Sequence, residues 1–344
     1  MNSPDPAPVI DLIEAFRRSK TMFAAVALGV FDRLEGKPAD AATVAGEIHA
    51  KTASVERLLD ACVSLGFLCK SGGLYGNEPV AATYLCRSSA RALTGYILYS
   101  NEVLFRMWAN LEDAVIEGSH RWKQTFGLEG NIFDHFFKND EAMRTFLLGM
   151  HGFGVLSSPK VVAAFDLSRF RKLVDLGGAT GHLAIAACER YPEMRAAVFD
   201  LPRVIEVARE QVSRSGVAPR VDLIAGDFFS DELPEADVFA VGRILHDWSE
   251  EKIHSLLAKV LARLPAGGGL LISEKLLVED KTGPIPALMQ SLNMLVCTEG
   301  RERSLGEYRT LLEAAGFRDV QGRVTGAPLD AVLAIARGRD GSRR

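Results

Sequence analysis

The sequence predicts an α/β fold: a parallel β-sheet with crossover helices in the carboxyl-terminal half, a terminal antiparallel hairpin, and a mostly α-helical domain before them. Three observations support this prediction. After Arg171, short apolar strands alternate with helical segments, which is typical of a parallel sheet. A glycine cluster at residues 177–181 follows the first of these strands. Before residue 166, helical periodicity dominates and is interrupted by one short hairpin signal.

Composition excludes several classes of protein. The chain has 344 residues, enough for two domains, with 48% apolar and 24% charged residues. Its 40 basic and 44 acidic residues give a net charge of -4, so we expect no nucleic-acid partner. Five cysteines without a CxxC pair argue against a disulfide framework and for a cytoplasmic protein. No uninterrupted apolar run reaches the length of a membrane span, so we expect no membrane partner.

The first hundred residues predict a winged-helix layout. Helices are expected at residues 9–20, 22–34, 41–49 and 54–65, with Ser54 capping the last. The stretch GFLCKSGGLYGN then indicates a hairpin. Ten basic and ten acidic residues make this region neutral, which disfavours DNA binding because phosphate contacts dominate such affinity. The apolar stretches at 23–31 and 58–68 form either a partner interface, which predicts a homodimer, or a core.

The rest of the chain is predicted to be a helical segment and then the sheet. Strands are expected at KLVDL, AAVFD, RVDLIAG, VFAVGRIL and GLLISEKLL, and a hairpin at FRDVQGRVTG and LDAVLAIARG. The predicted divisions are a winged-helix-like domain at 1–95, a helical linker and substrate-pocket segment at 96–165, a catalytic domain at 166–338, and a polar tail at 339–344.

The glycine turn in RKLVDLGGATGH limits the choice of ligand. A P-loop needs Gly-Lys followed by Ser or Thr, but His182 follows Gly181. The dinucleotide fingerprint fails because Ala179 and His182 occupy the third and sixth positions counted from Gly177. What remains is an acidic residue, Asp175, two positions before the glycines. This arrangement resembles motif I of the class I S-adenosylmethionine-dependent methyltransferases, a Rossmann-like fold, and implies cofactor contacts at Asp175, Gly177 and Gly178.

Acidic side chains also end the next two predicted strands. Asp200 can accept hydrogen bonds from both ribose hydroxyls. Asp227, after Gly226, can accept a bond from an adenine amino group, and the Phe228 ring can stack on the base. Each residue alone has an ordinary structural explanation as a cap or a core residue, but three successive strand ends of this kind favour a nucleoside ligand.

A histidine and several carboxylates are expected at the same edge of the sheet. The segment VFAVGRILHDW brings Arg243, His246 and Asp247 there, Glu274 ends the following strand, and Glu302 precedes the last helix. A histidine held by a carboxylate has one defined tautomer and a stabilised imidazolium, as a general base requires. The alternative is a buried core histidine. We see no ligand spacing typical of a magnesium site and expect no metal.

The segments HDW, SEKLL, SLNMLVCTEGRERS and EAAGFRDV resemble the plant-type O-methyltransferases, which include caffeic acid and isoflavone enzymes, and are most similar to the acetylserotonin O-methyltransferases. FAAVALGVFDRL, ERLLDACVSLGFL and GLYGN resemble that family's winged-helix dimerisation domain. The resemblance implies methyl transfer from S-adenosylmethionine to a hydroxyl of a small aromatic metabolite, leaving S-adenosylhomocysteine. By position it implies His246 as base with Glu274 and Glu302 flanking it, cofactor contacts at Asp200, Asp227, Phe228 and Arg243, and a substrate pocket at Met150, Phe153, Asn293, Met294 and Cys297.

The sequence departs from the family pattern at two positions. Ala179 replaces the middle glycine of the turn, which is acceptable if this residue keeps a negative φ. Cys297 lies where the resemblance places a glutamine-containing pocket in the acetylserotonin enzymes, so the resemblance does not identify the molecule that accepts the methyl group. Phe137 aligns with an aromatic lid over the cofactor.

Two alternatives remain open from the sequence. One is a member of the same fold with altered chemistry, such as decarboxylation or hydroxylation. The other is a winged-helix regulator that senses a metabolite. Methyl transfer to a phenol requires a stronger base than a free histidine, because the pKa of a phenol, ~10, is about 3.5 units above the pKa of the free imidazole. The neighbouring carboxylates must therefore raise the basicity of His246.

Overall fold

The computed structural model describes residues 3–129 and 140–337. The chain divides into two compact units, and the boundary in the sequence lies between Arg106 and Met107. Each unit has a hydrophobic core of its own. Phe137 and the predicted tail at 339–344 lie outside the described residues.

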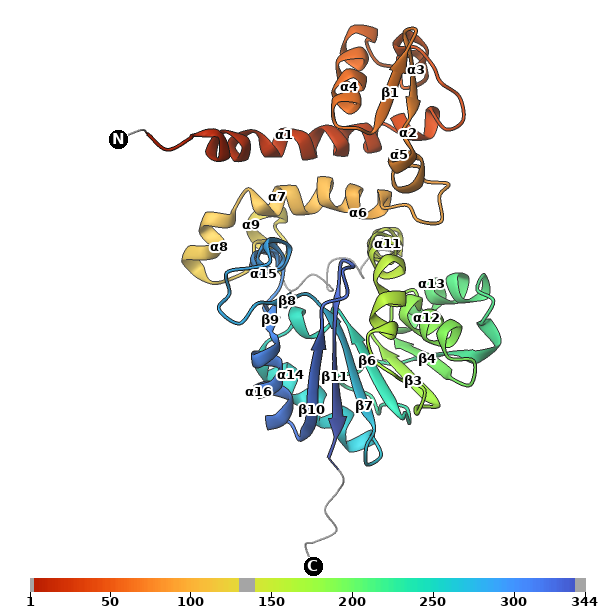
Figure 1. The fold of residues 1–344 in the computed structure, drawn as a ribbon, viewed down its shortest axis with the longest axis vertical. Helices are drawn as coiled ribbons and strands as arrows, with labels where there is room; N and C mark the ends of the chain where they lie inside the picture. The colour runs from red at the N-terminus through yellow and green to blue at the C-terminus, as the bar shows by residue number, and fades with distance from the viewer. Residues whose placement is uncertain (1–2, 130–139, 338–344) are drawn as a thin grey trace, which may run out of the picture. The chain divides into compact units, whose positions relative to one another are not determined.

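The first unit consists of helices and one small hairpin (Figure 1). Its elements are α1 (Ala7–Ala27), α2 (Val30–Arg33), α3 (Ala41–Glu47), α4 (Thr52–Ser64), β1 (Leu68–Ser71), β2 (Leu74–Asn77), α5 (Pro79–Tyr84), α6 (Thr94–Tyr99) and η1 (Ser100–Leu104). The short helix α7 (Phe105–Trp108) continues the chain into the second unit. This is the helix-and-hairpin layout predicted from the sequence.

The hairpin forms where the sequence predicts it. Leu68 pairs with Asn77 and Ser71 pairs with Leu74. Gly72 and Gly73 form the turn with φ of 57° and 85°. Two positive φ values are what a two-residue turn needs to match the twist of its strands, and glycine meets that need without steric cost.

Two details of the predicted helices are wrong. The break between the two helices expected at 9–20 and 22–34 lies later than predicted: α1 runs to Ala27 and the short α2 begins at Val30, because the chain turns at Gly29, where φ is 68°. Ser54 does not cap α4 but lies in its first turn, after the N-cap Lys51. Helical periodicity continues through both places, so the pattern alone does not reveal the boundary.

The apolar stretches at 23–31 and 58–68 contribute to the core of the first unit. Their most buried members are Ala25, Val26, Val30, Phe31, Leu59 and Cys62. The most exposed large apolar side chains of this unit lie instead on the first half of α1: Val9, Ile10, Leu12, Ile13 and Phe16, each 54% exposed or more. An exposed apolar surface of this kind favours association with another surface.

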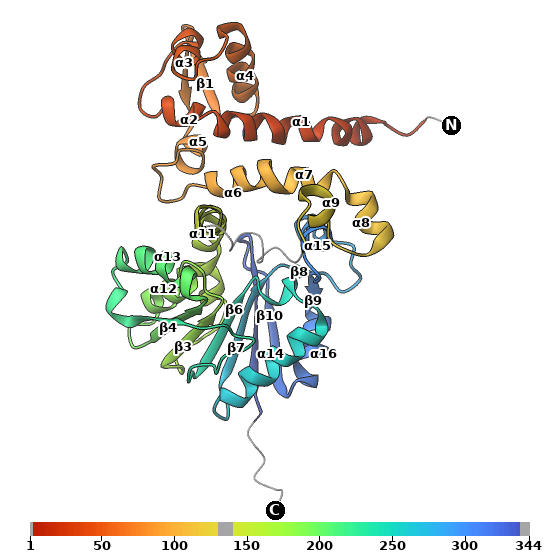
Figure 2. The same ribbon diagram turned by 180° about the vertical axis from the view of Figure 1, so that it is seen from behind.

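The second unit is built on a seven-stranded sheet (Figures 1 and 2). Its strands are β3 (Lys172–Leu176), β4 (Arg195–Asp200), β5 (Val221–Ala225), β6 (Val238–Gly242), β7 (Gly269–Glu274), β10 (Phe317–Arg323) and β11 (Asp330–Ala336), in the order β10-β11-β7-β6-β3-β4-β5. Strands β3 to β7 are parallel, and β10 and β11 are antiparallel. The predicted parallel sheet with a terminal hairpin is confirmed. Its strand order reverses between β3 and β6, where open α/β sheets bind ligands.

Helices cover both faces of this sheet. The helices of the second unit are α8 (Leu111–Glu117), α9 (Trp122–Phe126), α11 (Asp140–Ala163), α12 (His182–Arg190), α13 (Pro202–Ser213), η2 (Ala218–Arg220), η3 (Leu245–Asp247), α14 (Glu250–Arg263), α15 (Ile285–Cys297) and α16 (Leu305–Ala314), with a short pair β8 (Leu276–Leu277) and β9 (Arg303–Ser304). Those packed on the sheet faces are α11, α12 and α13 on one side and α14 and α16 on the other. Side chains alternate along β3: Leu173 packs with α11, α12 and α13, whereas Val174 packs with α14 and α16. Burial on both faces explains why these strands are apolar throughout.

Helix α11 is the one helix among the described residues that is long and apolar enough to cross a membrane. The segment is Ala142–Ala163, and 44% of its apolar 18-residue stretch is buried within the protein. Val161 and Val162 pack into the same core as α12 and the sheet. A core helix can be as long and as apolar as a membrane span. The packing of α11 against α12 and the sheet therefore accounts for its apolar sequence.

We predict that the exposed apolar face of α1 contributes to the dimer contact. Leu12→Glu combined with Ile13→Glu should shift the protein toward a monomer at micromolar concentration, because the contact would have to bury two carboxylates. Light scattering measures the change. Val324→Glu, at a position 82% exposed in another part of the chain, is the matched control and should leave the mass unchanged. A double variant with the mass of the unaltered protein would show that α1 lies outside the contact.

Candidate active site

The glycine turn after β3 packs tightly against its surroundings. Gly177 has φ of 66°, and a Cβ added there would lie 2.5 Å from the Ile244 Cδ1 atom and 3.3 Å from the Phe228 ring. A Cβ at Gly178 would lie 2.7 Å from the carboxyl group of Asp175. Both positions therefore need glycine for steric reasons, and the turn brings the ends of β3, β5 and β6 together.

Ala179 does not keep the negative φ that the sequence argument required of it. Its φ is 49°, in the left-handed region that glycine favours. The backbone N–H of Ala179 donates a hydrogen bond to the Asp200 carboxylate at 2.9 Å. This bond holds a conformation that costs a non-glycine residue about 1–2 kcal/mol. Strain of this kind persists where the surrounding structure fixes the backbone.

Two buried carboxyl groups lie beside the turn. Asp175 is 2% exposed, and its Oδ2 atom has no hydrogen-bond partner. Burial, and then the charge of Asp200, raise the pKa of Asp175 to about 8. Burial also raises the pKa of Asp200 to about 6, although the N–H groups of Ala179 and Leu201 donate to it. An unpartnered buried carboxyl oxygen suits a cationic or hydrogen-bond-donating ligand.

The loop after β5 is ordered by its own hydrogen bonds. Asp227 Oδ1 accepts the Phe229 N–H at 2.8 Å, and the Asp227 N–H donates to Asp231 Oδ2 at 2.9 Å. A side chain at Gly226 would collide with the Phe199 ring. Phe228 lies next to the glycine turn, as the Gly177 environment shows. The structure thus brings this loop and the turn together at one edge of the sheet.

Arg243 follows β6 and also has a positive φ, of 57°. Its backbone N–H donates to the Ser273 carbonyl at 3.0 Å. The guanidinium lies 5.9 Å from the centre of the Phe153 ring. This contact connects the predicted cofactor edge with α11, which carries Phe153 and the half-buried Met150.

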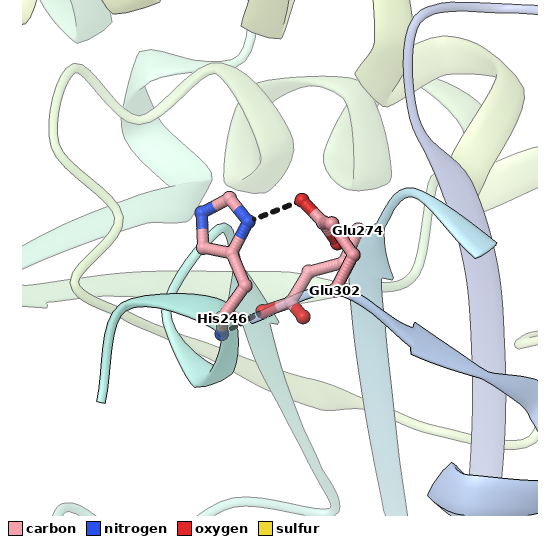
Figure 3. Close-up of side chains that lie close together, drawn as sticks. All are labelled: His246, Glu274 and Glu302. Carbon is pink, nitrogen blue, oxygen red and sulfur yellow. Dashed lines mark hydrogen bonds and ion pairs between the residues drawn. The ribbon is translucent and has the colours of Figure 1, made fainter. Parts of the chain in front are cut away.

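His246 lies on the short helix η3 and not on a strand, because β6 ends at Gly242. Its ring is buried, and the Nδ1 atom is 2.7 Å from Glu302 Oε1 (Figure 3). Since a carboxylate only accepts hydrogen bonds, Nδ1 carries the proton and Nε2 is the nitrogen left for chemistry. A carboxylate oxygen, Asp247 Oδ1, lies 3.8 Å from Nε2.

Glu274 lies within 4.8 Å of a ring nitrogen of His246, but it accepts hydrogen bonds from the backbone of the loop. Its Oε1 atom accepts the backbone N–H groups of Ile244, Leu245 and His246 at 3.1, 2.7 and 3.1 Å. Its Oε2 atom accepts the hydroxyl of the buried Tyr308. In Figure 3 one dashed line joins a carboxylate, that of Glu302, to the imidazole, and another joins the Glu274 carboxylate to the backbone nitrogen of His246. Glu274 therefore fixes the loop, and Glu302 fixes the ring.

Opposing effects determine the charge of His246. Burial lowers its pKa, but the negative charges of Glu302, Asp247 and Glu274 outweigh burial and raise the pKa of His246 to about 9. The basicity that the sequence argument required is therefore present. At neutral pH the ring is an imidazolium, so it must lose a proton at Nε2 before it can accept one.

The same three side chains form the one metal-like cluster among the described residues. His246, Glu274 and Glu302 each offer a ligand atom within 4.8 Å of the others, which the spacing in the sequence does not predict. The lone pairs of Glu274 already accept four protein donors, and Nδ1 of His246 is paired with Glu302. The cluster is thus a hydrogen-bonded support for the histidine, in which Glu302 Oε2 is a buried oxygen without a hydrogen-bond partner.

The predicted pocket residues of α15 contact nearby tryptophans. Asn293 Oδ1 accepts the Trp108 indole N–H at 2.8 Å, and the Cys297 carbonyl accepts the Trp122 indole N–H at 2.8 Å. An indole N–H only donates, so the amide oxygen of Asn293 must face Trp108 and its NH₂ group points elsewhere. Cys297 and Met294 are buried, and Cys297 Sγ lies 3.8 Å from Asn293 Oδ1.

The sequence argument missed Tyr308, and it named Trp108 only as one of several aromatic residues that form a core or line a substrate pocket. Both lie far in sequence from the groups they bind, Glu274 and Asn293. A tyrosine in an amphipathic helix such as α16 is ordinarily a core residue, so no local signal distinguishes it.

Comparison with known proteins identifies the family. Residues 108–318 match the O-methyltransferase domain, and residues 10–87 match the O-methyltransferase dimerisation domain. The chain belongs to the O-methyltransferase family. The dimerisation domain supports the predicted homodimer.

Individual members of the O-methyltransferase family are similar to this chain over nearly its whole length. Acetylserotonin O-methyltransferase of Gallus gallus is 40% identical over 338 residues, which cover 95% of this chain and 96% of that protein. The crystal structure of human N-acetylserotonin methyltransferase in complex with SAM has a TM-score of 0.90 at 37% identity, covering 98% of this chain and 99% of that one.

A longer relative matches over part of its length. The probable bifunctional dTTP/UTP pyrophosphatase/methyltransferase protein of Homo sapiens is 42% identical over 334 residues, 96% of this chain. The chain spans about half of that protein, 54% of its length. Together the matches confirm the predicted family, the methyltransferase fold and dependence on S-adenosylmethionine.

The residues present fit this cofactor. The turn at Gly177 and Gly178 packs its bare backbone against Ile244, Phe228 and Asp175, and the unpartnered Asp175 Oδ2 is an acceptor that suits a ligand carrying an ammonium group. The same edge carries Asp200, Phe228 and the positively charged Arg243. Donors, acceptors and an aromatic face thus meet where the strand order reverses.

We predict that the imidazolium of His246 persists above neutral pH. In the ligand-free protein, NMR of the imidazole nitrogens should give a midpoint near pH 9. Glu302→Gln should move the midpoint downward, because it removes the carboxylate charge that opposes the effect of burial. Glu232→Gln, an exposed carboxylate paired with Arg263, is the control and should change nothing. An unchanged midpoint in Glu302→Gln would contradict the assignment of the raised pKa to this ion pair.

Proposed function

We propose that the protein methylates a phenolic hydroxyl of a small aromatic metabolite, with His246 as the general base. The observation that supports this proposal most directly is the contact of His246 Nδ1 with Glu302 Oε1 at 2.7 Å. It orients the ring, fixes the tautomer and leaves Nε2 to take a proton. The similar chicken and human proteins are acetylserotonin O-methyltransferases, and the family activity supports the same reaction type here.

The proton balance of the proposed step is simple. The bound cofactor supplies an electrophilic sulfonium methyl group. His246 Nε2 removes the hydroxyl proton of the acceptor as the oxygen forms its bond to the methyl carbon and the carbon–sulfur bond breaks. The product is an aryl methyl ether beside an imidazolium that Glu302 stabilises. Because the pKa of His246 is about 9 and that of a phenol is ~10, the proton transfer is nearly balanced.

We also propose roles for the residues at the sheet edge. Asp175 accepts from the amino group of the cofactor, Asp200 from the ribose hydroxyls, and Asp227 from the adenine amino group, while Phe228 stacks on the base. The ordered turn and loop that hold these side chains support the assignment. Asn293 and the buried Cys297 line the acceptor side.

We predict that His246→Ala loses most methyl transfer. A positioned general base contributes on the order of 10²- to 10⁴-fold to the rate, so turnover of labelled S-adenosylmethionine with a responsive phenol should fall by that factor. Calorimetry with S-adenosylhomocysteine should show unchanged affinity, because the ring does not bind the cofactor. Glu302→Gln should cost less than His246→Ala. Near-full transfer by a folded His246→Ala dimer would refute the proposed base.

The pH dependence of catalysis is a separate prediction. The protonated ring cannot act as a base, so kcat/KM should rise as the pH increases toward about 9. In Glu302→Gln the pKa of His246 is lower, so the rise should begin at lower pH and reach a lower plateau. Comparing the two enzymes with one phenol cancels the ionisation of the substrate itself. Identical pH profiles of the two enzymes would show that the rise in kcat/KM reflects ionisation of the acceptor and not of His246.

A further inference from the structure

A single lysine holds the loop that follows β5. Lys259 lies on α14, and its Nζ atom donates to the backbone carbonyls of Phe228, Phe229 and Asp231 at 2.8, 2.9 and 2.7 Å. We propose that Lys259 is a positioning residue that sets the loop at 227–231 in the conformation that binds the adenine end of the cofactor. The proposal rests on the roles proposed above for Asp227 and Phe228.

The chemistry of the contact makes lysine suitable. An ammonium group has three donors and no acceptor, and here each of the three bonds goes to a different carbonyl of the same loop. Three carbonyl oxygens turned toward one point repel one another unless a cation lies between them. The loop conformation therefore depends on a charge supplied by a different element of the fold.

An arginine would not reproduce this arrangement. Its donors lie in one plane on a longer side chain, so a guanidinium needs acceptors placed for it, as at Arg220, whose NH1 atom donates to the carbonyls of Tyr191, Pro192 and Met194. The carbonyls of 228, 229 and 231 are placed around a compact ammonium instead. The next cation on the same helix, Arg263, binds differently: its NH1 atom pairs with the exposed carboxylate of Glu232 at 2.6 Å. Arg263 therefore offers a control at the same helix surface, next to the loop but bound to a side chain.

The loop also connects the cofactor edge with the histidine. The Phe229 ring packs edge-on against Phe228, with centroids 4.7 Å apart, and against Trp248, with centroids 5.0 Å apart. Trp248 is two residues after His246. Because His246 is anchored separately through Glu274 and Glu302, we expect a shift of the loop to weaken cofactor binding first and to leave the base in place.

The test is Lys259→Met, which keeps the length of the side chain and removes its donors. Calorimetry on the unligated dimer should show affinity for S-adenosylhomocysteine reduced by on the order of 10-fold or more, the effect of losing hydrogen bonds to a charged donor. The KM for S-adenosylmethionine should rise by the same factor. The kcat at saturation and the KM for the acceptor should stay within about 2-fold, because the histidine is anchored elsewhere. Lys259→Arg should be impaired in the same direction, and Arg263→Met should bind like the unaltered protein.

Separate outcomes test the proposal and its premise. If Lys259→Met, or Lys259→Arg should the methionine variant not fold, binds S-adenosylhomocysteine with unchanged affinity, Lys259 is not a positioning residue. The proposal would also be overturned if kcat and thermal stability fell while both KM values rose. Such a combined change would indicate a general structural role for Lys259. Asp227→Ala tests the premise: unchanged affinity there removes the adenine assignment of the loop, whatever Lys259 does.

Discussion

The hydrogen bonds around one buried carboxylate, Glu274, determine the geometry of this site. A carboxylate without solvent is stable only when donors surround it, and Glu274 receives three backbone N–H groups from 244–246 and the hydroxyl of Tyr308. The chain after β6 is thereby wrapped around the end of β7. His246 takes its place from this wrapping, and its ring direction from Glu302. Position and orientation thus depend on different carboxylates.

Strained backbone occurs where the site is held most firmly. Ala179 and Arg243 both have positive φ, and in each case the backbone N–H is fixed by an acceptor from a neighbouring strand, Asp200 in one and the Ser273 carbonyl in the other. Hydrogen bonds between adjacent strand ends maintain conformations that isolated residues avoid. The edge of the sheet is therefore preorganised, and a ligand need not pay the full cost of ordering it.

The electrostatic environment differs between the glycine-turn edge and the histidine: it favours neutral carboxyl groups at the first and a charged imidazolium at the second. Burial raises the pKa of Asp175 and Asp200, so both carboxyl groups resist ionisation until a donor or cation binds beside them. Three carboxylates act in the other direction at His246 and favour its charged form. One part of the site is suited to receive positive charge, and the other to hold a proton taken from the acceptor.

The sequence alone determined the α/β class, the parallel sheet, the terminal hairpin and the set of chemically competent residues, because strand periodicity, turn glycines and strand-end carboxylates are local features. It did not determine the φ of Ala179, the place where α1 ends, or the roles of Glu274, Tyr308 and Lys259. Those depend on hydrogen bonds between segments far apart in the chain: Tyr308 with Glu274, and α14 with the loop after β5. A carboxylate at a strand end can face a ring or a backbone, and only the packed structure decides which donors reach it.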